Sequence, residues 1–246
     1  VLAGIVAYFY MTDRPEQAKW LSDSERAIVK QQLELDEKAQ GKRDSDWRTM
    51  FTNPMVWLLI AVFFCLLCAN STLTFWMPTV IREAGFTSPM EVGWIAGAAY
   101  LLGAAGMIIN GRHSDKRGEV RWHFAGSALL GAVGMLALAI TMGMESIPVL
   151  AALTVMVLAL VGTMSAIPVF WQMPNMLLSG GAAAVGVALI NSVANLAGFG
   201  APYLMGLIKA STGKVAPGLY LVAIVEALAA ILAIAFIARI QRRKSA

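Results

Sequence analysis

Polar side chains that could bind a small solute recur at helical spacing inside apolar stretches of this chain. Asn191 and Asn195 are four residues apart and therefore share one helix face, and Asn70 and Thr74 repeat that spacing. Amides in apolar surroundings need partners, which either neighbouring helices or a wet cavity would supply. Both interpretations are open. The other polar or aromatic candidates for solute contact are Phe75, Tyr100, Trp171 and Gln172.

Glu226 is the only acid well inside an apolar run. A buried ion costs several kcal/mol, so such residues tend to mark function. Glu226 could carry a proton or pair with a partner. It also lies toward the outer end of its run, where its side chain could reach the headgroups.

Catalytic motifs are absent from the sequence. There is no H-E-x-x-H, no G-x-S-x-G and no glycine-rich loop ending in Gly-Lys-Ser/Thr. Cys65 and Cys68 form a C-x-x-C, but no second pair exists to complete a zinc site, and an apolar run favours plain helix packing. The histidines, His113 and His123, flank a charged stretch. We expect no enzyme activity, metal or cofactor.

Composition identifies the class of protein. Of 246 residues, 58% are hydrophobic and 14% charged, with a mean hydropathy of +0.67, whereas soluble domains carry about 25% charged residues. The net charge of +4 comes from cations placed between long apolar runs, which does not favour nucleic-acid binding. The sequence predicts an all-α membrane protein that contacts the lipid bilayer.

Six apolar runs are long enough for helices that cross a membrane, which takes about 20 residues each. Small residues at spacing four, such as Gly93 and Gly97, predict close helix packing within them. The opening run, residues 1–11, is too short to cross the membrane, and we interpret it as the last turns of a spanning helix. The six runs are approximately 54–81, 91–110, 124–144, 147–171, 182–208 and 219–240.

Residues 12–53 form a polar segment between the opening run and the six spans. Within it, Ser22 and Glu25 form an S-x-x-E capping box before apolar residues at helical spacing. The pattern predicts an amphipathic helix from Ser22 to Gln40. We expect this helix to lie beside the membrane or against the bundle.

The distribution of basic residues predicts the orientation. Sixteen Lys and Arg fall on the side that holds the polar segment, the 111–123 stretch and the C-terminal tail, against three on the other side. The positive-inside rule then places the polar segment and the C-terminus in the cytoplasm.

The stretch 111–118, Gly-Arg-His-Ser-Asp-Lys-Arg-Gly, is a short basic turn between two spans. It resembles the signature turn of the major facilitator superfamily. The histidine at position 113 of this turn resembles the anion:cation symporter branch of that superfamily (tartrate, sugar-acid and phthalate permeases). Phe75-Trp-Met-Pro-Thr79, Phe170-Trp-Gln-Met-Pro174 and Ala188-Leu-Ile-Asn-Ser192 point the same way. The matching signature residues are Gly111, Asp115, Lys116, Gly118 and Arg121.

The resemblance covers nearly the whole chain and identifies it as the C-terminal half of such a transporter. It implies that residues 1–11 end helix 6, that 12–53 form the central cytoplasmic loop, and that 54–246 hold helices 7 to 12 and a basic tail. It implies alternating access, with a substrate site between two halves. The implied substrate contacts are first Trp171 and Asn191, then Asn70, Phe75, Tyr100, Gln172 and Asn195. Asp115 and Arg121 would belong to a cytoplasmic gate.

Charge adds a constraint, because residues 146–208 contain no Asp, Glu, Lys, Arg or His. An anion bound at midplane needs a cation, so we expect the N-terminal half to supply it together with the proton-coupling acid. The expected function is import of a small organic anion with protons across a bacterial inner membrane. An exporter of amphiphilic compounds and a non-transporting scaffold or receptor are the alternatives.

Overall fold

The computed structural model describes residues 20–40, 47–178 and 181–245, together with positions 4, 9 and 18. The chain forms two compact units, residues 1–45 and residues 46–246. Apart from Gly4 and Phe9, the predicted helix end at residues 1–11 lies outside the described residues.

The first unit contains helix α2, Asp23–Gln40. The capping box predicted from the sequence is present. The Glu25 N–H donates to Ser22 Oγ at 3.3 Å, and the Ser22 N–H donates to Glu25 Oε2 at 2.9 Å. The Ser22 backbone bond, followed by its hydroxyl bond, lowers the pKa of the Glu25 carboxyl. The helix predicted over Ser22–Gln40 is therefore confirmed, while its amphipathic role stays a prediction.

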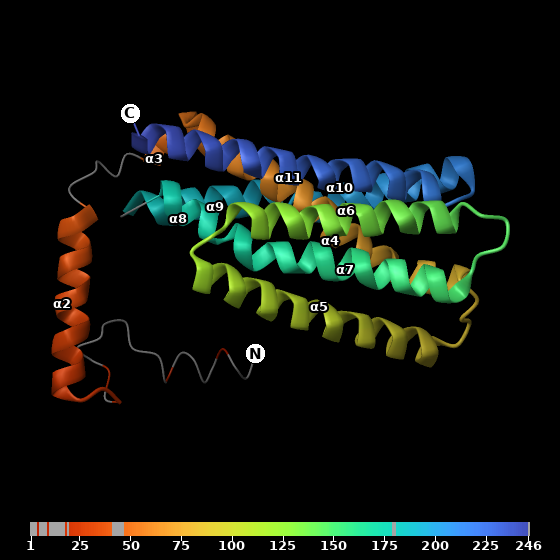
Figure 1. Cartoon of the computed structure of the whole chain (residues 1–246), viewed down its shortest axis with the longest axis horizontal. Coiled ribbons are helices and arrows are strands. Elements are labelled where there is room, and N and C mark those ends of the chain that lie inside the picture. The colour runs from red at the N-terminus through yellow and green to blue at the C-terminus, as the bar shows by residue number, and fades with distance from the viewer. Residues whose placement is uncertain are drawn as a thin grey trace. The chain divides into compact units, whose positions relative to one another are not determined.

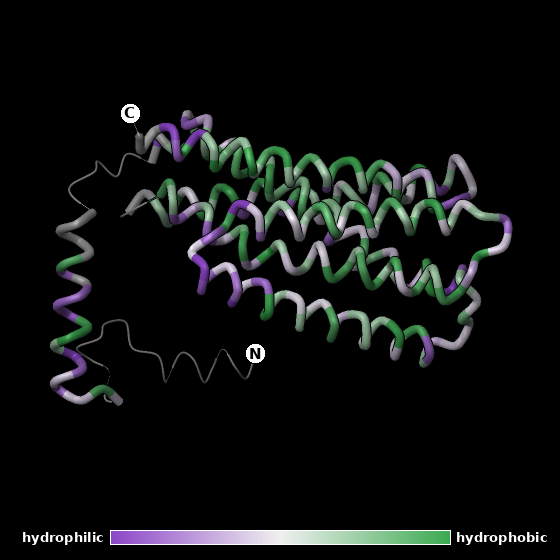
Figure 2. Tube along the Cα trace, viewed as in Figure 1, coloured by the Kyte–Doolittle hydropathy of each residue, from purple (hydrophilic) through white to green (hydrophobic). Residues whose placement is uncertain are grey.

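The second unit is a bundle of helices with strongly apolar middles and polar ends (Figures 1 and 2). Among the described residues, six stretches are long and apolar enough to cross a membrane, which confirms the six predicted spans. A short helix, α3, spans Trp47–Thr52 ahead of them. The spans are α4 Pro54–Glu83, α5 Pro89–Arg117, α6 Arg121–Met142, α7 Val149–Phe170 with α8 Gln172–Leu177, α9 Gly181–Ala194 with α10 Ala197–Thr212, and α11 Ala216–Ser245.

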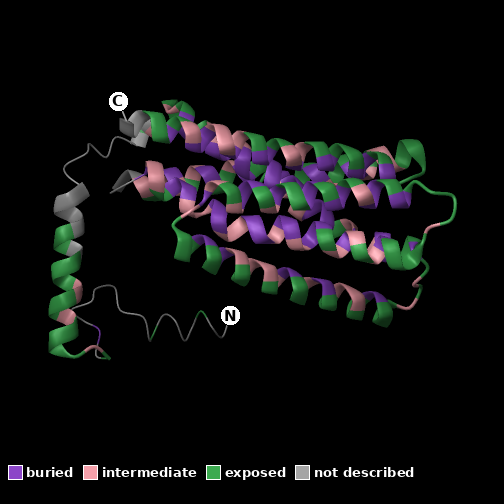
Figure 3. Ribbon diagram, viewed as in Figure 1, coloured by how far each residue is buried: buried purple, intermediate pink, exposed green. Residues whose placement is uncertain are grey.

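Packing places α4 and α7 inside the bundle and leaves α5 and α10 at its margins. Helix α7 packs against α5 and α6, α6 against α11, and α11 against α4, which also contacts α7, α9 and α10. Most of α4 is buried, whereas α5 and the α9–α10 span are largely exposed (Figure 3). Among the described residues of this unit, nothing covers these two broad helix faces.

Glycines bring α6 and α7 into backbone contact. A Cβ added at Gly162 would lie 2.6 Å from the Cα of Gly131, and one added at Gly134 would lie 2.7 Å from the Cα of Ala159. Real Cβ atoms do not approach so closely. Small residues allow this approach, which replaces side-chain interdigitation with backbone dispersion contacts.

Gly93 and Gly97 do not have the packing role that their spacing predicted. Both are exposed on α5, and no described atom lies within 4 Å of a Cβ built at either position. The prediction was wrong for this pair within the chain, because spacing alone cannot say which side of a helix a neighbour occupies.

The predicted charged turn at 111–123 is shorter than expected. Helix α5 continues through Arg117, and α6 begins at Arg121, so only residues 118–120 connect them. Gly118 ends α5 in the left-handed conformation, with φ of 60°, and the Glu119 N–H donates to the Ser114 carbonyl at 3.2 Å. Gly111, Asp115 and Lys116 therefore lie on a helix instead of a loop.

Two other departures concern helix breaks. The sequence predicted that the fourth span would end after Trp171. In the structure Trp171 is itself a turn residue, and the helix continues beyond it as α8, Gln172–Leu177. Conversely, the fifth span contains a break at Asn195 and Leu196, between α9 and α10, that the sequence did not predict. There the Asn195 amide donates to the Asn191 carbonyl at 2.7 Å, a local bond that competes with the regular ladder.

The glycine contact between α6 and α7 gives a stability prediction. Gly162→Ala should lower the free energy of unfolding by about 1–3 kcal/mol, because the added methyl group forces the two backbones apart. The measurement is thermal unfolding in detergent. The matched control is Gly126→Ala on exposed α6 surface, with no described atom within 4 Å, which should leave stability unchanged or raise it. Equal effects of the two variants would contradict the contact.

Candidate functional site

Asn191 and Asn195 begin an exposed stripe along α9 and α10. The Asn195 amide donates to Asn191 Oδ1 at 2.9 Å, so the two side chains form one hydrogen-bonded pair. Phe199 and Tyr203 continue the stripe at spacing four, 75% and 57% exposed, with stacked rings 5.5 Å apart. The sequence analysis missed these two rings, although the spacing from Asn195 could have found them. The stripe combines amides with aromatic faces.

A second polar group joins α4 to α5. Tyr100 Oη donates to Thr74 Oγ1 at 3.2 Å, and Thr74 donates to the Asn70 carbonyl at 2.8 Å. Phe75 stands beside them and is 64% exposed. The structure thus links Tyr100 through Thr74 to the backbone of Asn70, and Phe75 follows Thr74 on the same helix.

Trp171 lies in an aromatic cluster. Its ring meets Phe63 edge-on at 5.1 Å and Phe170 at 5.4 Å, while Phe63 and Phe170 stack at 4.3 Å. Phe63 precedes Asn70 by seven residues on α4, a rise of about 10 Å. Trp171 is only partly buried, so an edge remains available to solvent or solute.

Gln172 contacts the signature turn. Its amide donates to Asp115 Oδ1 at 2.8 Å, and Ser114 Oγ lies 3.4 Å from its Oε1. Ser114 in turn donates to the Glu119 carbonyl at 2.8 Å. Gln172 therefore connects α8 to the end of α5, and we group it with the signature residues in place of the substrate contacts.

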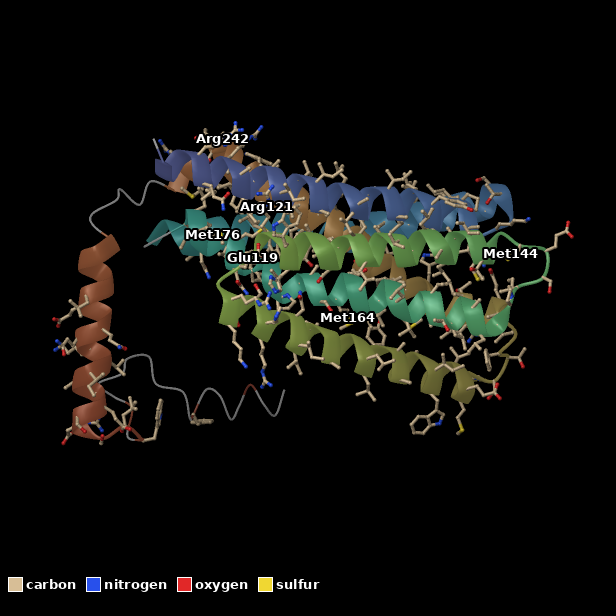
Figure 4. The ribbon with its side chains drawn as sticks, viewed as in Figure 1. Glu119, Arg121, Met144, Met164, Met176 and Arg242 are labelled. Atoms are coloured by element: carbon tan, nitrogen blue, oxygen red, sulfur yellow. The ribbon has the colours of Figure 1, made fainter. Side chains whose placement is uncertain are left out.

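The remaining signature residues surround the same helix end. Gly111 is buried, and a Cβ there would meet Pro168 of α7 at 3.6 Å, whereas Lys116 is exposed. Arg121 places its guanidinium 4.9 Å from the centre of the Trp122 ring, not against Asp115. Figure 4 shows Glu119, Arg121 and Arg242 at one end of the bundle and Met144 at the other. The turn and the tail thus share one end, as the charge distribution predicted.

Glu226 is fully buried, so the interpretation that it reaches the headgroups was wrong. It follows the start of α11 by ten residues, about 15 Å along the helix, close to the middle of a 30 Å hydrocarbon layer. Its Oε1 lies 2.6 Å from Thr163 Oγ1, and Oε2 has no described partner. Gly131 provides the space, because a Cβ there would clash with this carboxyl group.

Counting protons indicates which atom donates. Thr163 Oγ1 also lies 2.8 Å from the Ala159 carbonyl, and a hydroxyl has one proton to give. When that proton goes to Ala159, the Glu226 carboxyl must donate to Thr163. The described residues place no cation beside Glu226, and a buried unpaired carboxylate is costly, so we expect the acid to be protonated.

Six spanning helices with exposed amide and aromatic stripes define a multi-pass helical membrane protein. The chain matches the Major Facilitator Superfamily over residues 1–202, so it belongs to that family. Its curated relatives are named as transporters and not as enzymes.

Several curated relatives support this assignment. The chain is 41% identical over 224 residues to the "Putative tartrate transporter" of Agrobacterium vitis, covering 91% of this chain and 50% of the relative. It is 32% identical over 252 residues to the "Quinolone resistance transporter" of Acinetobacter baumannii, covering 100% and 56%. It is 32% identical over 219 residues to the "Inner membrane transport protein RhmT" of Escherichia coli, covering 85% and 47%. The chain spans about half the length of these relatives.

The Glu226 site gives a prediction that distinguishes a protonated carboxylic acid from a carboxylate at this position. Glu226→Gln should fold with nearly unchanged thermal stability, because an amide can donate to Thr163 as a protonated carboxyl does. Glu226→Leu should lose stability, because it removes that bond. Infrared spectroscopy should show the carbonyl stretch of a protonated carboxylic acid that disappears in Glu226→Gln. A carboxylate band assigned to Glu226 at neutral pH would contradict the prediction.

Proposed function

We propose that this chain is the C-terminal half of a proton-coupled transporter that imports a small organic anion by alternating access. The observation that carries the proposal is the exposed stripe of Asn191, Asn195, Phe199 and Tyr203, which offers hydrogen bonds and ring faces on a helix span that its own chain leaves uncovered. The tartrate transporter relative supports an organic anion as substrate.

The substrate surface combines the stripe with the group around Thr74 and with the open edge of Trp171. Neutral amides and hydroxyls donate to carboxylate and hydroxyl oxygens, and aromatic faces pack on a carbon skeleton. In the described parts of α4, α5, α7 and α10, cations occur only toward the helix ends, and Lys209 there donates to Glu83 at 2.6 Å. The cation for a carboxylate is therefore assigned to the other half of the transporter.

The segment boundaries and orientation belong to the same proposal. Residues 1–11 end the helix before the central loop, residues 12–53 form that loop, and residues 54–246 form the half-bundle and tail. The shared end of the signature turn and tail faces the cytoplasm of a bacterial inner membrane, supported by the excess of cations there and by the Escherichia coli relative.

Asp115 serves the proposed cytoplasmic gate. Gln172 fixes one of its oxygens, and the side chain remains exposed at the helix end. It can accept a further hydrogen bond from the other half. Lys116 is exposed beside Asp115. The Arg121 guanidinium lies over the Trp122 ring, so Arg121 contributes to the gate by holding the geometry of the turn.

The proposed surface predicts the effect of one amide. We would join this chain to the N-terminal half of the Agrobacterium vitis relative and measure tartrate uptake driven by a pH jump in proteoliposomes. Asn191→Ala should raise KM about tenfold to a hundredfold, the cost of one hydrogen bond to a charged group, while uptake still depends on the pH gradient. Ser192→Ala, an adjacent exposed hydroxyl on the neighbouring face, is the control.

Retention of the original KM in Asn191→Ala would remove this residue from the site. Transport of a lipophilic dye in place of tartrate or galactonate would favour the exporter, which the quinolone relative makes the alternative to test. Binding without uptake of either compound would favour a scaffold or receptor. The chain reconstituted without another half should give no uptake, because half of the cavity is missing.

A further inference from the structure

An open groove lined by polar and apolar side chains lies between α5 and α6, at the end where residues 118–120 join them. It encloses about 310 Å³, enough for a phosphate group and several waters, since one water occupies about 30 Å³. Asn110 forms its floor by donating to the Ser165 carbonyl of α7 at 2.9 Å and to Ser127 Oγ at 3.0 Å. The lining residues that the argument uses are Asn110, His113, Arg117, Trp122, His123 and Ser127.

A chain of hydrogen bonds crosses the groove. His123 Nδ1 lies 2.6 Å from Glu119 Oε2, and His123 Nε2 lies 2.7 Å from His113 Nδ1. With Glu119 accepting, His123 carries its proton on Nδ1 and accepts from His113 on Nε2. Nε2 of the exposed His113 is then the position where the chain can take up a proton.

Glu119 keeps its negative charge, but both of its oxygens accept hydrogen bonds within the protein. Burial raises the pKa of its carboxyl, but hydrogen bonds from the Trp122 N–H and from His123 outweigh it and hold the pKa below its ordinary value. Glu119 Oε1 accepts from the Trp122 N–H at 2.8 Å, so both oxygens have partners.

The other charged groups around the groove are cations. Arg117 lines it and is exposed, and Arg112 and Lys116 lie nearby on α5. On α6, Arg121 lies over the Trp122 ring, and α7 has no ionisable residue. Asp115 points to Gln172 of α8. The groove is therefore positive, and a proton on His113 makes it more so.

The groove opens toward an apolar surface suited to acyl chains. Below Trp122, the exposed side of α6 continues with aliphatic side chains at helical spacing. Trp122 itself is 62% exposed, and an indole at a helix end is typical of the headgroup level. The aliphatic residues are Leu129, Leu130, Val133, Leu136 and Ile140.

We propose that the groove between α5 and α6 binds the phosphate headgroup of an anionic phospholipid, with Arg117 and His113 on the phosphate and an acyl chain along α6. The site lies on the opposite side of the α5 end from the Asp115–Gln172 contact and does not depend on the proposed substrate. Cationic pockets between helices at the membrane surface suit this ligand.

The test compares two arginines of the same helix end. The complete chain is purified, exchanged into nanodiscs of phosphatidylcholine with or without phosphatidylglycerol, and its retained lipids are counted by native mass spectrometry. Arg117→Gln should weaken phosphatidylglycerol retention about fivefold, the effect of one cation at the membrane surface. Arg112→Gln removes the same charge from outside the groove and should change retention less than about twofold.

The pH dependence tests His113. Arg117, together with burial and His123, holds the pKa of His113 below its ordinary value. Phosphatidylglycerol retention should therefore rise as the pH falls from about 7 to about 5, where His113 takes up its proton, and His113→Gln should abolish that rise. Three results would overturn the proposal: equal losses in Arg117→Gln and Arg112→Gln, equal retention of phosphatidylcholine, or displacement of the lipid by millimolar inorganic phosphate. The last would identify a site for free phosphate.

Discussion

The lack of water inside a bilayer is the constraint on which this structure depends. A polar group there must find its partner within the protein, since leaving it unpaired costs several kcal/mol. Thr72 Oγ1 and Glu226 Oε2 have no described partner, but other polar groups of the described spans meet that demand locally: Asn195 bonds Asn191, Thr74 bonds the Asn70 carbonyl, and Glu226 Oε1 meets Thr163. The last of these requires the glycine contact between α6 and α7, because Gly131 leaves room for the carboxyl group. Close helix packing and the hydrogen bonding of buried polar groups thus depend on each other in this bundle.

The same constraint divides the bundle into a sealed side and an open side. Helices α6, α7 and α11 close over small residues and hide the one acid of their middles. The α9–α10 span instead keeps amides and stacked rings exposed, an arrangement that pure lipid contact does not favour. The proposed facing half, which would complete the cavity, gives a reason, supported by membership of the major facilitator superfamily and by the half-length coverage of the relatives. The open side is therefore where the proposed transport chemistry belongs.

Much of the fold could be predicted from the sequence. Apolar runs of sufficient length gave six spans because spanning helices need about 20 residues, and Ser22 with Glu25 marked the start of α2. Individual site residues were harder. Asn191 and Asn195 were paired correctly by spacing, but Gln172 turned toward Asp115, and Phe199 and Tyr203 were missed. A helical period states which residues share a face and says nothing about what that face meets.

The sequence by itself determined the class, the spans and the side that carries the cations, because these follow from hydropathy and charge along the chain. Only the tertiary structure decided contacts between helices: that Gly131 and Gly162 pack while Gly93 and Gly97 do not, that Glu226 is buried, and that His113, His123 and Glu119 form one chain. Those contacts depend on the rotation of each helix about its axis. The rotation of a helix about its axis is set by all the helices that pack against it, so it cannot be predicted from the local sequence of that helix.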